Sequence, residues 1–332
     1  MTARSRRRVQ RLALLTLGAL LVVLGLSRLA EAAFTFGDRH AERHVERTVQ
    51  TVSDRGRDVL YDEAFRVRPG GALDLDLGAE SVVVRTVGGD RARVVVEGRG
   101  RDARAEFERR RFSARAAGGG LTVRTDPERR GWRLGRTDAR FTVTVEIPRR
   151  FSADLDVGSG SVEVGPLDGS LRVDTGSGSI RVADVDGRSV VLDTGSGSVH
   201  AHSLRGEVEI DTRSGSVSVE RVDGPLSVDT GSGGVEVGLV RGPATVDTGS
   251  GGVRLALAGA APVEVGTGSG SVTLELPRAG FDVDVAASSV RIDEALGFRG
   301  RNERGRAEGR LGRGGPDIDV ETGSGSVRLR AR

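Results

Sequence analysis

Short runs of alternating apolar and polar residues, separated by glycine and serine, recur along this chain. Residues 171–175 (Leu-Arg-Val-Asp-Thr) and 179–182 (Ser-Ile-Arg-Val) are two such runs. A period of two is typical of a half-buried β-strand. Between them, residues 176–178 (Gly-Ser-Gly) accept positive φ and predict a sharp turn, and residues 185–187 predict a second corner.

The unit Asp-Thr-Gly-Ser-Gly-Ser-Val repeats with small changes. From Asp156 onward successive copies begin 18 or 19 residues apart, and only the last interval, of 37, is longer. We interpret that interval as two periods with one coil interrupted between residues 291 and 320. Two strands and two turns in each period predict an all-β fold, a parallel β-solenoid with about 18 residues per coil. The copies begin at Asp76 (a looser copy), Asp156, Asp174, Asp193, Asp211, Asp229, Asp247, Gly266, Asp284 and Glu321.

The phase of the alternation assigns each position to the inside or the outside of a coil. Leu171, Val173, Ile180 and Val182 point inward and predict a continuous apolar core that only stacked coils can bury. The threonines beside the turns share the inward phase and predict a ladder of hydroxyls, each satisfied by the next. These threonines are Thr175, Thr194, Thr212, Thr230 and Thr248.

Aspartates occupy the outward phase in six successive coils. Stacked coils lie about 4.8 Å apart, so neighbouring carboxylates repel by roughly 1 kcal/mol per pair in water. One explanation is that each carboxylate accepts hydrogen bonds from its own Gly-Ser turn. The other is a row of calcium ions, since hard cations bind clustered carboxylates. The candidate metal ligands are Asp156, Asp174, Asp193, Asp211, Asp229 and Asp247.

The N-terminus predicts export. Arg-rich residues precede an apolar run from 12 to 26, and an Ala-x-Ala sequence ends at Ala32. Residues 1–32 are therefore a signal peptide or, if uncleaved, a membrane anchor, and the body of the protein leaves the cytoplasm. Residues 33–63 are predicted to be a linker.

Residues 64–150 predict an N-terminal β region and residues 151–332 the repeat solenoid. Strand patterns in the β region cover 65–67, 73–77, 81–86, 93–97, 121–124 and 141–147, and 126–140 is a charged loop. Residues 297–315 hold seven Gly and six Arg and predict a mobile loop. The last strand pattern reaches almost to the C-terminus, which predicts an uncapped stack whose edge can pair with another molecule.

Composition narrows the function classes. All fifty basic residues are Arg, so a phosphate-loop or Schiff-base lysine is excluded, and the absence of cysteine excludes disulfides and thiolate chemistry. Without residues 1–32 the chain has 44 Arg and 46 acids, a net charge of −2. That balance gives no support to nucleic-acid binding. Residues 151–290 are acidic (9 Arg, 20 acids), whereas residues 61–150 are basic (20 Arg, 14 acids).

Histidines offer a weaker metal hypothesis. His200 and His202 share one strand face, and Glu220 is expected beside His202 on the next coil. His40 and His44 lie four apart in a segment with helical spacing. The more usual interpretation of both pairs is that they are ordinary surface residues. No catalytic residue is nominated and no cofactor is predicted.

The order of these segments resembles a known bacterial family. A strand follows Arg-Pro-Gly-Gly (68–71), a Val-Glu-Ile-Pro strand (145–148) leads into Ser-Gly-Ser-Val repeats, and the chain closes with Gly-Gly-Pro-Asp-Ile-Asp-Val-Glu-Thr-Gly-Ser-Gly-Ser-Val (314–327). Together they resemble the domain of unknown function labelled "putative adhesin", over residues 64–330. The resemblance implies an exported or membrane-anchored β-solenoid and supplies no catalytic or binding residues.

These observations predict a non-enzymatic envelope or cell-surface protein, adhesin-like or a scaffold, that presents a repetitive β surface. The alternatives are a carbohydrate-active β-helix enzyme and a calcium-binding structural repeat protein. The expected partner is a component of the cell envelope or surface, not nucleic acid, with membrane contact only through the N-terminal segment. End-to-end self-association is the further expectation that the open edge raises.

Overall fold

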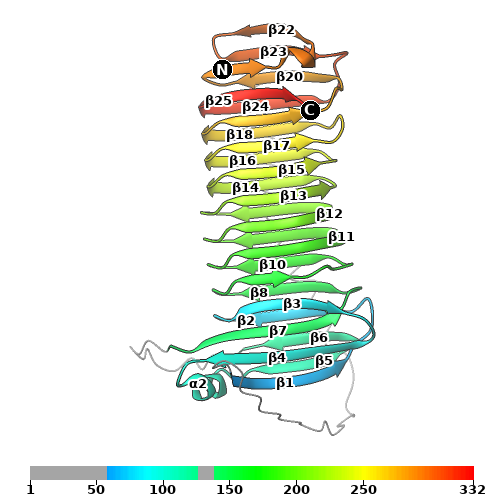
Figure 1. Cartoon of the computed structure of the whole chain (residues 1–332), viewed down its shortest axis with the longest axis vertical. Helices are drawn as coiled ribbons and strands as arrows, with labels where there is room; N and C mark the ends of the chain where they lie inside the picture. The colour runs from blue at the N-terminus through cyan, green and yellow to red at the C-terminus, as the bar shows by residue number, and fades with distance from the viewer. Residues whose placement is uncertain (1–57, 126–137) are drawn as a thin grey trace, which may run out of the picture. The chain divides into compact units, whose positions relative to one another are not determined.

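The structure is a computed structural model that describes residues 58–125 and 138–332. Its described residues form an all-β body, which confirms the predicted class, with one α-helix and one 3₁₀ turn among them. The strands stack along one axis as successive coils of a β-solenoid (Figure 1). The predicted signal peptide or anchor (1–32) and most of the predicted linker lie outside the described residues.

Each regular coil contributes one strand to each of two faces. In face 1, Leu171 pairs in parallel with Ala153 of the preceding coil and with Val190 of the following coil, 18 and 19 positions away. Strands β11 and β12 are long because they run around the corner from face 2 to face 1. The strands of face 1 are β8 (Ser152–Val157), β10 (Leu171–Thr175), the second halves of β11 (Ile180–Thr194) and β12 (Val199–Thr212), β14 (Leu226–Ser232), β16 (Ala244–Ser250) and β18 (Val263–Ser269).

Face 2 carries the return strand of each coil. Ile180 pairs with Val162 on one side and with Val199 on the other, again in parallel. The strands of face 2 are β9 (Val162–Val164), the first halves of β11 and β12, β13 (Val217–Asp223), β15 (Val235–Val240), β17 (Val253–Leu257) and β19 (Val272–Leu276).

The core lies between the two faces, on the phase that the alternation predicts. Leu171, Val173, Ile180 and Val182 are at most 4% exposed. The bridge between Leu167 and Val185 adds a third buried column at the corner. The sequence predicted only a turn there, but an apolar side chain in every coil keeps the corner inside the core. The other members of this column are Leu204, Val222 and Val240.

The turn glycines are needed for close stacking. A Cβ on Gly178 would lie 1.8 Å from the carbonyl oxygen of Gly160 in the coil below, and a Cβ on Gly197 would lie equally close to Gly178. Neither Gly176 nor Gly178 has a positive φ. The predicted reason for these glycines was therefore wrong, because it is the distance between neighbouring turns that excludes a side chain.

At the N-terminal end the coils do not follow sequence order. Strands β2 (Ala72–Leu77) and β3 (Ser81–Val87) form the coil next to β8 and β9, and β6 (Gly120–Arg124) and β7 (Arg140–Pro148) lie outside it. Antiparallel strands then close the end: β4 (Arg91–Arg99) on β7, β1 (Asp58–Arg66) on β4, and β5 (Ser113–Ala117) on β6.

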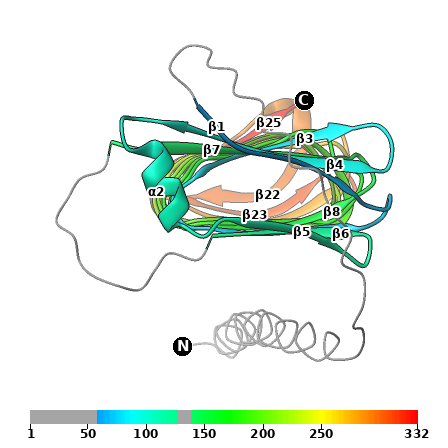
Figure 2. The same cartoon turned by 90° about the horizontal axis from the view of Figure 1, so that it is seen from below.

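Helix α2 (Ala103–Arg109) completes this N-terminal cap. Figure 2 looks along the stack and shows α2 to one side, with β1, β4 and β7 in one layer and β5, β6 and β8 in the other. The sequence missed α2 and β5. It also assigned residues 58–63 to the linker, whereas β1 begins at Asp58, and the predicted loop at 126–140 lies outside the described residues except for its last three positions.

The C-terminal end is also out of order. Strands β24 (Asp317–Ser324) and β25 (Ser326–Ala331) pair with β18 and β19 on one side. On their other side they pair with β20 (Phe281–Ala286) and β21 (Ser289–Ile292), which come earlier in the sequence. The last coil of the chain therefore lies inside the stack (Figure 1).

The segment predicted as a mobile loop is an antiparallel hairpin. Strand β22 (Phe298–Glu303) pairs with β23 (Arg306–Leu311), β23 pairs with β20, and a 3₁₀ turn η1 (Glu294–Leu296) precedes them. Ala307 and Leu311 are fully buried against the stack. The sequence did not predict these strands, because their few apolar residues stand among many Gly and Arg and give no clear alternation. The predicted interrupted coil is this C-terminal cap, and the prediction of an uncapped end was wrong.

Candidate functional site

The outward aspartates form one continuous column along face 1. Asp174 pairs with Asp156 and Asp193, and the same register joins Asp193 to Asp211. The alternating valines and leucines that fill the core place every one of these carboxylates outside. The structure adds Asp76, which pairs with Asp156, so the column has seven members. We call it the Asp ladder: Asp76, Asp156, Asp174, Asp193, Asp211, Asp229 and Asp247.

The predicted capping of the turns by these aspartates was wrong. Within the described residues, the six carboxylates of the Asp ladder from Asp156 to Asp247 have neither a hydrogen bond nor an ion pair. The threonines carry out that role. The Thr194 hydroxyl accepts a hydrogen bond from the amide of Gly197 (3.1 Å) and donates one to the carbonyl oxygen of Gly178 in the preceding coil (2.9 Å).

The predicted threonine ladder is correct in burial and wrong in its partners. Thr175, Thr194 and Thr212 are fully buried, as predicted. Their hydroxyls bond to turn backbones and not to one another. Each hydroxyl donates to the turn of the preceding coil, and those of Thr175 and Thr194 also accept from the turn amide that the aspartate was expected to use.

The Asp ladder is electrostatically strained. Partial burial, followed by repulsion from neighbouring aspartates, raises the pKa of Asp156, Asp193, Asp211 and Asp247 above the ordinary value of 3.8. Burial likewise raises the pKa of Asp154, in the adjacent outward column. Keeping these carboxylates ionised therefore lowers the free energy of unfolding.

The Asp ladder ends differently at its two limits. At the N-terminal limit Arg124 lies 3.2 Å from a carboxylate oxygen of Asp76 and 2.7 Å from one of Asp74. At the other limit Gly266 takes the next position and Glu321 the one after it. A shallow depression of about 440 Å³ lies there, lined by Asp229, Asp247 and Glu321.

A second charged column runs along the corner of the same coils, and its charges are paired. Arg205 lies 2.6 Å from Asp186 and 3.7 Å from Asp223, which also pairs with Arg241. Arg149 lies 3.1 Å from Asp168. We call this the mixed column: Arg149, Asp168, Asp186, Arg205, Asp223 and Arg241.

His202 lies in a depression of about 450 Å³ beside the mixed column. Its Nε2 atom is 3.4 Å from Glu220, as the repeat spacing predicted, but its nearest partner is Asp184, at 2.6 Å from Nδ1. The hydrogen bond to Asp184 raises the pKa of His202 above 6.5. His200 pairs in register with Arg181 and Ser218, neither of which is a metal ligand of this kind.

Within residues 58–125 and 138–332, no group of three or more His, Asp or Glu side chains is arranged to hold a metal ion. His40 and His44 lie outside the described residues. Calcium binding along the Asp ladder stays a prediction.

The N-terminal cap contains a buried ion pair that no sequence pattern signals. Glu80, in the turn between β2 and β3, is 2% exposed and accepts a hydrogen bond from the amide of Ala79 (2.8 Å). It pairs with Arg110, whose guanidinium lies 4.6 Å from the ring centroid of Phe141. These contacts join the end of α2 to the turn between β2 and β3 and to β7.

The fold and the repeat together define a β-solenoid with an acidic face. Residues 71–330 match the family described as Toastrack DUF4097, and the chain belongs to that family. This confirms the resemblance drawn from the sequence. No curated protein matches the chain.

Several solved structures are similar to the chain at low identity. One described as a putative adhesin from Parabacteroides distasonis is 12% identical, covers 81% of this chain and 96% of its own, and has a TM-score of 0.44. A putative adhesin from Bacteroides fragilis is 11% identical, covers 67% and 98%, and has a TM-score of 0.42. A structure described as a putative lipid binding protein, also from Parabacteroides distasonis, is 12% identical, covers 84% and 98%, and has a TM-score of 0.40.

Proposed function

We propose that this chain is an exported, non-enzymatic envelope or cell-surface protein that uses face 1 to bind a component of the envelope or of the cell surface. It acts as an adhesin-like protein or a scaffold. Family membership supports this class of protein. The observation that carries the proposal is the Asp ladder, which repeats one outward-facing carboxylate in seven successive coils.

The ladder suits a partner that is itself extended and repetitive. Carboxylates about 4.8 Å apart present a line of negative charge, and six of the seven have no ion pair within the described residues. A partner with repeated cationic groups gains from every coil that it covers, because the contacts act in parallel. Nucleic acid is a poor partner for this face, since its phosphates would be repelled.

The location is the second part of the proposal. The Arg-rich start and apolar run of residues 1–32 support export, with a cleaved signal peptide or a retained anchor as the two forms. The described part of the chain contains no helix that is long and apolar enough to cross a membrane. The sequence of residues 1–32 is the reason that we assign membrane contact to the N-terminal segment, with residues 33–57 as the connection to the solenoid.

Cell fractionation with N-terminal sequencing of the recovered protein tests the location. A chain that starts near Ala33, in the medium or on the outer surface, supports a released or surface-bound protein. A chain that keeps its Arg-rich start in the membrane fraction supports a tethered scaffold. Recovery of the protein in the cytoplasm would contradict both forms.

Binding to isolated envelope material tests the role of the Asp ladder. We expect the triple variant Asp193→Asn, Asp211→Asn, Asp229→Asn to lose binding at low salt. The control is Asp168→Asn with Asp186→Asn in the mixed column, which removes negative charge from neighbouring coils without touching face 1. Equal binding by all three proteins would remove the Asp ladder from the proposal.

Calcium is the second candidate ligand of the same face, because the carboxylates have no internal donor that neutralises them. If calcium binds, the ion should raise the melting temperature of the wild type well beyond the effect of magnesium at equal ionic strength. The triple Asn variant should lose that difference. Equal shifts with the two ions would exclude calcium and leave the cationic partner.

A further inference from the structure

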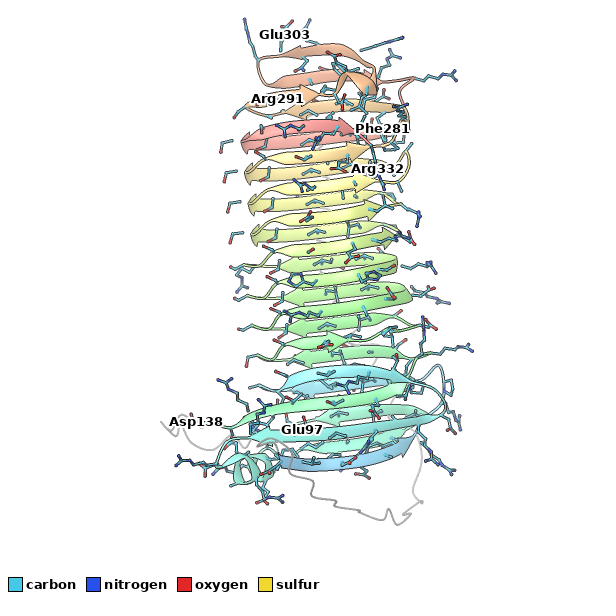
Figure 3. All side chains as sticks on the ribbon, viewed as in Figure 1. Glu97, Asp138, Phe281, Arg291, Glu303 and Arg332 are labelled. Atoms are coloured by element: carbon cyan, nitrogen blue, oxygen red, sulfur yellow. The ribbon has the colours of Figure 1, made fainter. Side chains whose placement is uncertain are left out.

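The coil that the chain makes last does not lie at the end of the stack. Strands β24 and β25 fill a slot between β18 and β19 on one side and β20 and β21 on the other. Figure 3 shows Arg332, the final residue, below Phe281, Arg291 and Glu303, which precede it in the sequence. The inner coil therefore has a paired neighbour on each side: β18 and β19 on one, and β20 and β21 on the other, where β20 is also paired with β23.

The two walls of the slot hold the coil by the repeat pattern. Ile318 pairs with Val263 on one side and with Val283 on the other, so all three side chains share the inward phase. The hydroxyl of Thr322 donates to the carbonyl oxygen of Gly270 in the neighbouring coil (3.2 Å), in the same way as the threonines of the regular coils. The hydroxyls of Ser271 and Ser326 lie 3.1 Å apart.

The connection into the slot is a short hinge. Residues 312–316 (Gly-Arg-Gly-Gly-Pro) join β23 to β24, and Gly312 and Gly314 have φ values of 56° and 79°. Glycine adopts this region without strain, whereas most residues do not. These two glycines are therefore the positions in the connection at which the backbone turns most easily.

We propose that the slot is a dimerisation site, which takes the C-terminal coil of a second copy of this chain in place of its own. Every contact inside the slot is the same whether the coil comes from the same chain or from another, so only the hinge and the association entropy separate the two forms. Exchange of an identical element is a low-cost route to a dimer. A second copy is the occupant because it carries the hydroxyls and apolar side chains already matched to both walls.

The absence of cysteine permits a direct test. Two full-length chains, one with Ser271→Cys and a small tag and the other with Ser326→Cys and a large tag, are unfolded, mixed, refolded together and oxidised. In-register parallel strands bring paired Cα atoms to about 4.8 Å, which lies within disulfide range. Exchange brings the two thiols together across chains, and a disulfide heterodimer appears on a non-reducing gel.

The matched control uses Ser232→Cys and Ser250→Cys. These residues are exposed and paired in neighbouring coils, and both coils lie inside the regular stack. We expect the 271/326 heterodimer to exceed this control, and its fraction to rise by about tenfold for a tenfold increase in refolding concentration while the fraction is low. A 271/326 yield no higher than that of the control would overturn the proposal.

Discussion

The Asp ladder and the mixed column occupy the same coils, yet their charges are arranged in opposite ways. In the mixed column Arg205 lies between Asp186 and Asp223, and the charges compensate. In the Asp ladder Asp211 lies between Asp193 and Asp229, with the same strand spacing and no cation between them. The solenoid can therefore accommodate compensating charges at neighbouring outward positions, and in the part of the chain that the structure describes the six members of the Asp ladder from Asp156 to Asp247 have none.

This difference separates a stabilising surface from one suited to binding. Paired charges on the mixed column already have partners, so an outside ligand must displace them. In the Asp ladder the unpaired carboxylates of Asp193 and Asp211 have a raised pKa and gain from any external cation that approaches. A bound cation would relieve the repulsion between these carboxylates, and that relief would add to the free energy of binding.

The largest effect should come from the inward position next to the Asp ladder. Val173→Asp places a carboxylate in the core beside Asp174, and we expect it to lower the free energy of unfolding by more than about 4 kcal/mol. Arg181→Asp, at an outward position of face 2, should change it by no more than about 1 kcal/mol. Denaturant unfolding followed by circular dichroism measures both. Similar losses would mean that the comparison of two outward columns rests on the wrong strand phase.

Charge reversal should give the next largest effect on the free energy of unfolding. It introduces compensating charges into the Asp ladder and repulsive ones into the mixed column. Asp211→Arg turns two repulsive neighbour pairs into attractive ones and should raise the free energy of unfolding by about 1–2 kcal/mol. Arg205→Asp places a third carboxylate between Asp186 and Asp223 and should lower it by about 1 kcal/mol. Thermal and denaturant melts at low salt measure the two changes. Shifts of the same sign would remove the distinction between the columns.

Charge neutralisation should give the same signs with smaller sizes. We expect Asp193→Asn to stabilise the protein by up to about 1 kcal/mol, because it removes repulsion from Asp174 and Asp211. Asp186→Asn should destabilise it slightly, since it removes one partner of Arg205 at a largely exposed site. Raising the ionic strength should shrink both differences. If the effect of Asp193→Asn kept its full size at about 1 M salt, charge repulsion would not be its cause.

The smallest effect concerns pH. Four ladder carboxylates have folded-state pKa values above 3.8, so near and above that pH the folded protein binds more protons than the unfolded chain. Their destabilisation is complete above the folded pKa values and disappears below the ordinary one. The advantage of Asp193→Asn over the wild type should therefore decrease as the pH is lowered from about 7 towards about 4. An advantage that grows on acidification would contradict the assigned direction of the shift.

Much of the regular solenoid follows from local pattern. Alternation at residues 171–175 and 179–182 assigned the core and the outward aspartates correctly, because a strand places successive side chains on opposite faces. The hydrogen-bond partners of the ladder residues did not follow. Whether a turn is capped by Asp193 or by Thr194 depends on how close the preceding turn lies, and that distance is a property of the stack.

The sequence by itself determined the coil: the strand phase, the apolar columns and the repetition of an aspartate on one face. Only the tertiary structure decided the order in which the coils stack and the partners that close the two ends. The physical reason is that every coil presents nearly the same backbone hydrogen-bonding groups and the same apolar side chains to its neighbours. Pairing of β24 with β18 is then as compatible with the repeat as pairing of β20 with β18. The hinge at 312–316 and the caps built from β1, β4, β5, β22 and β23 select among arrangements that the repeat leaves equivalent.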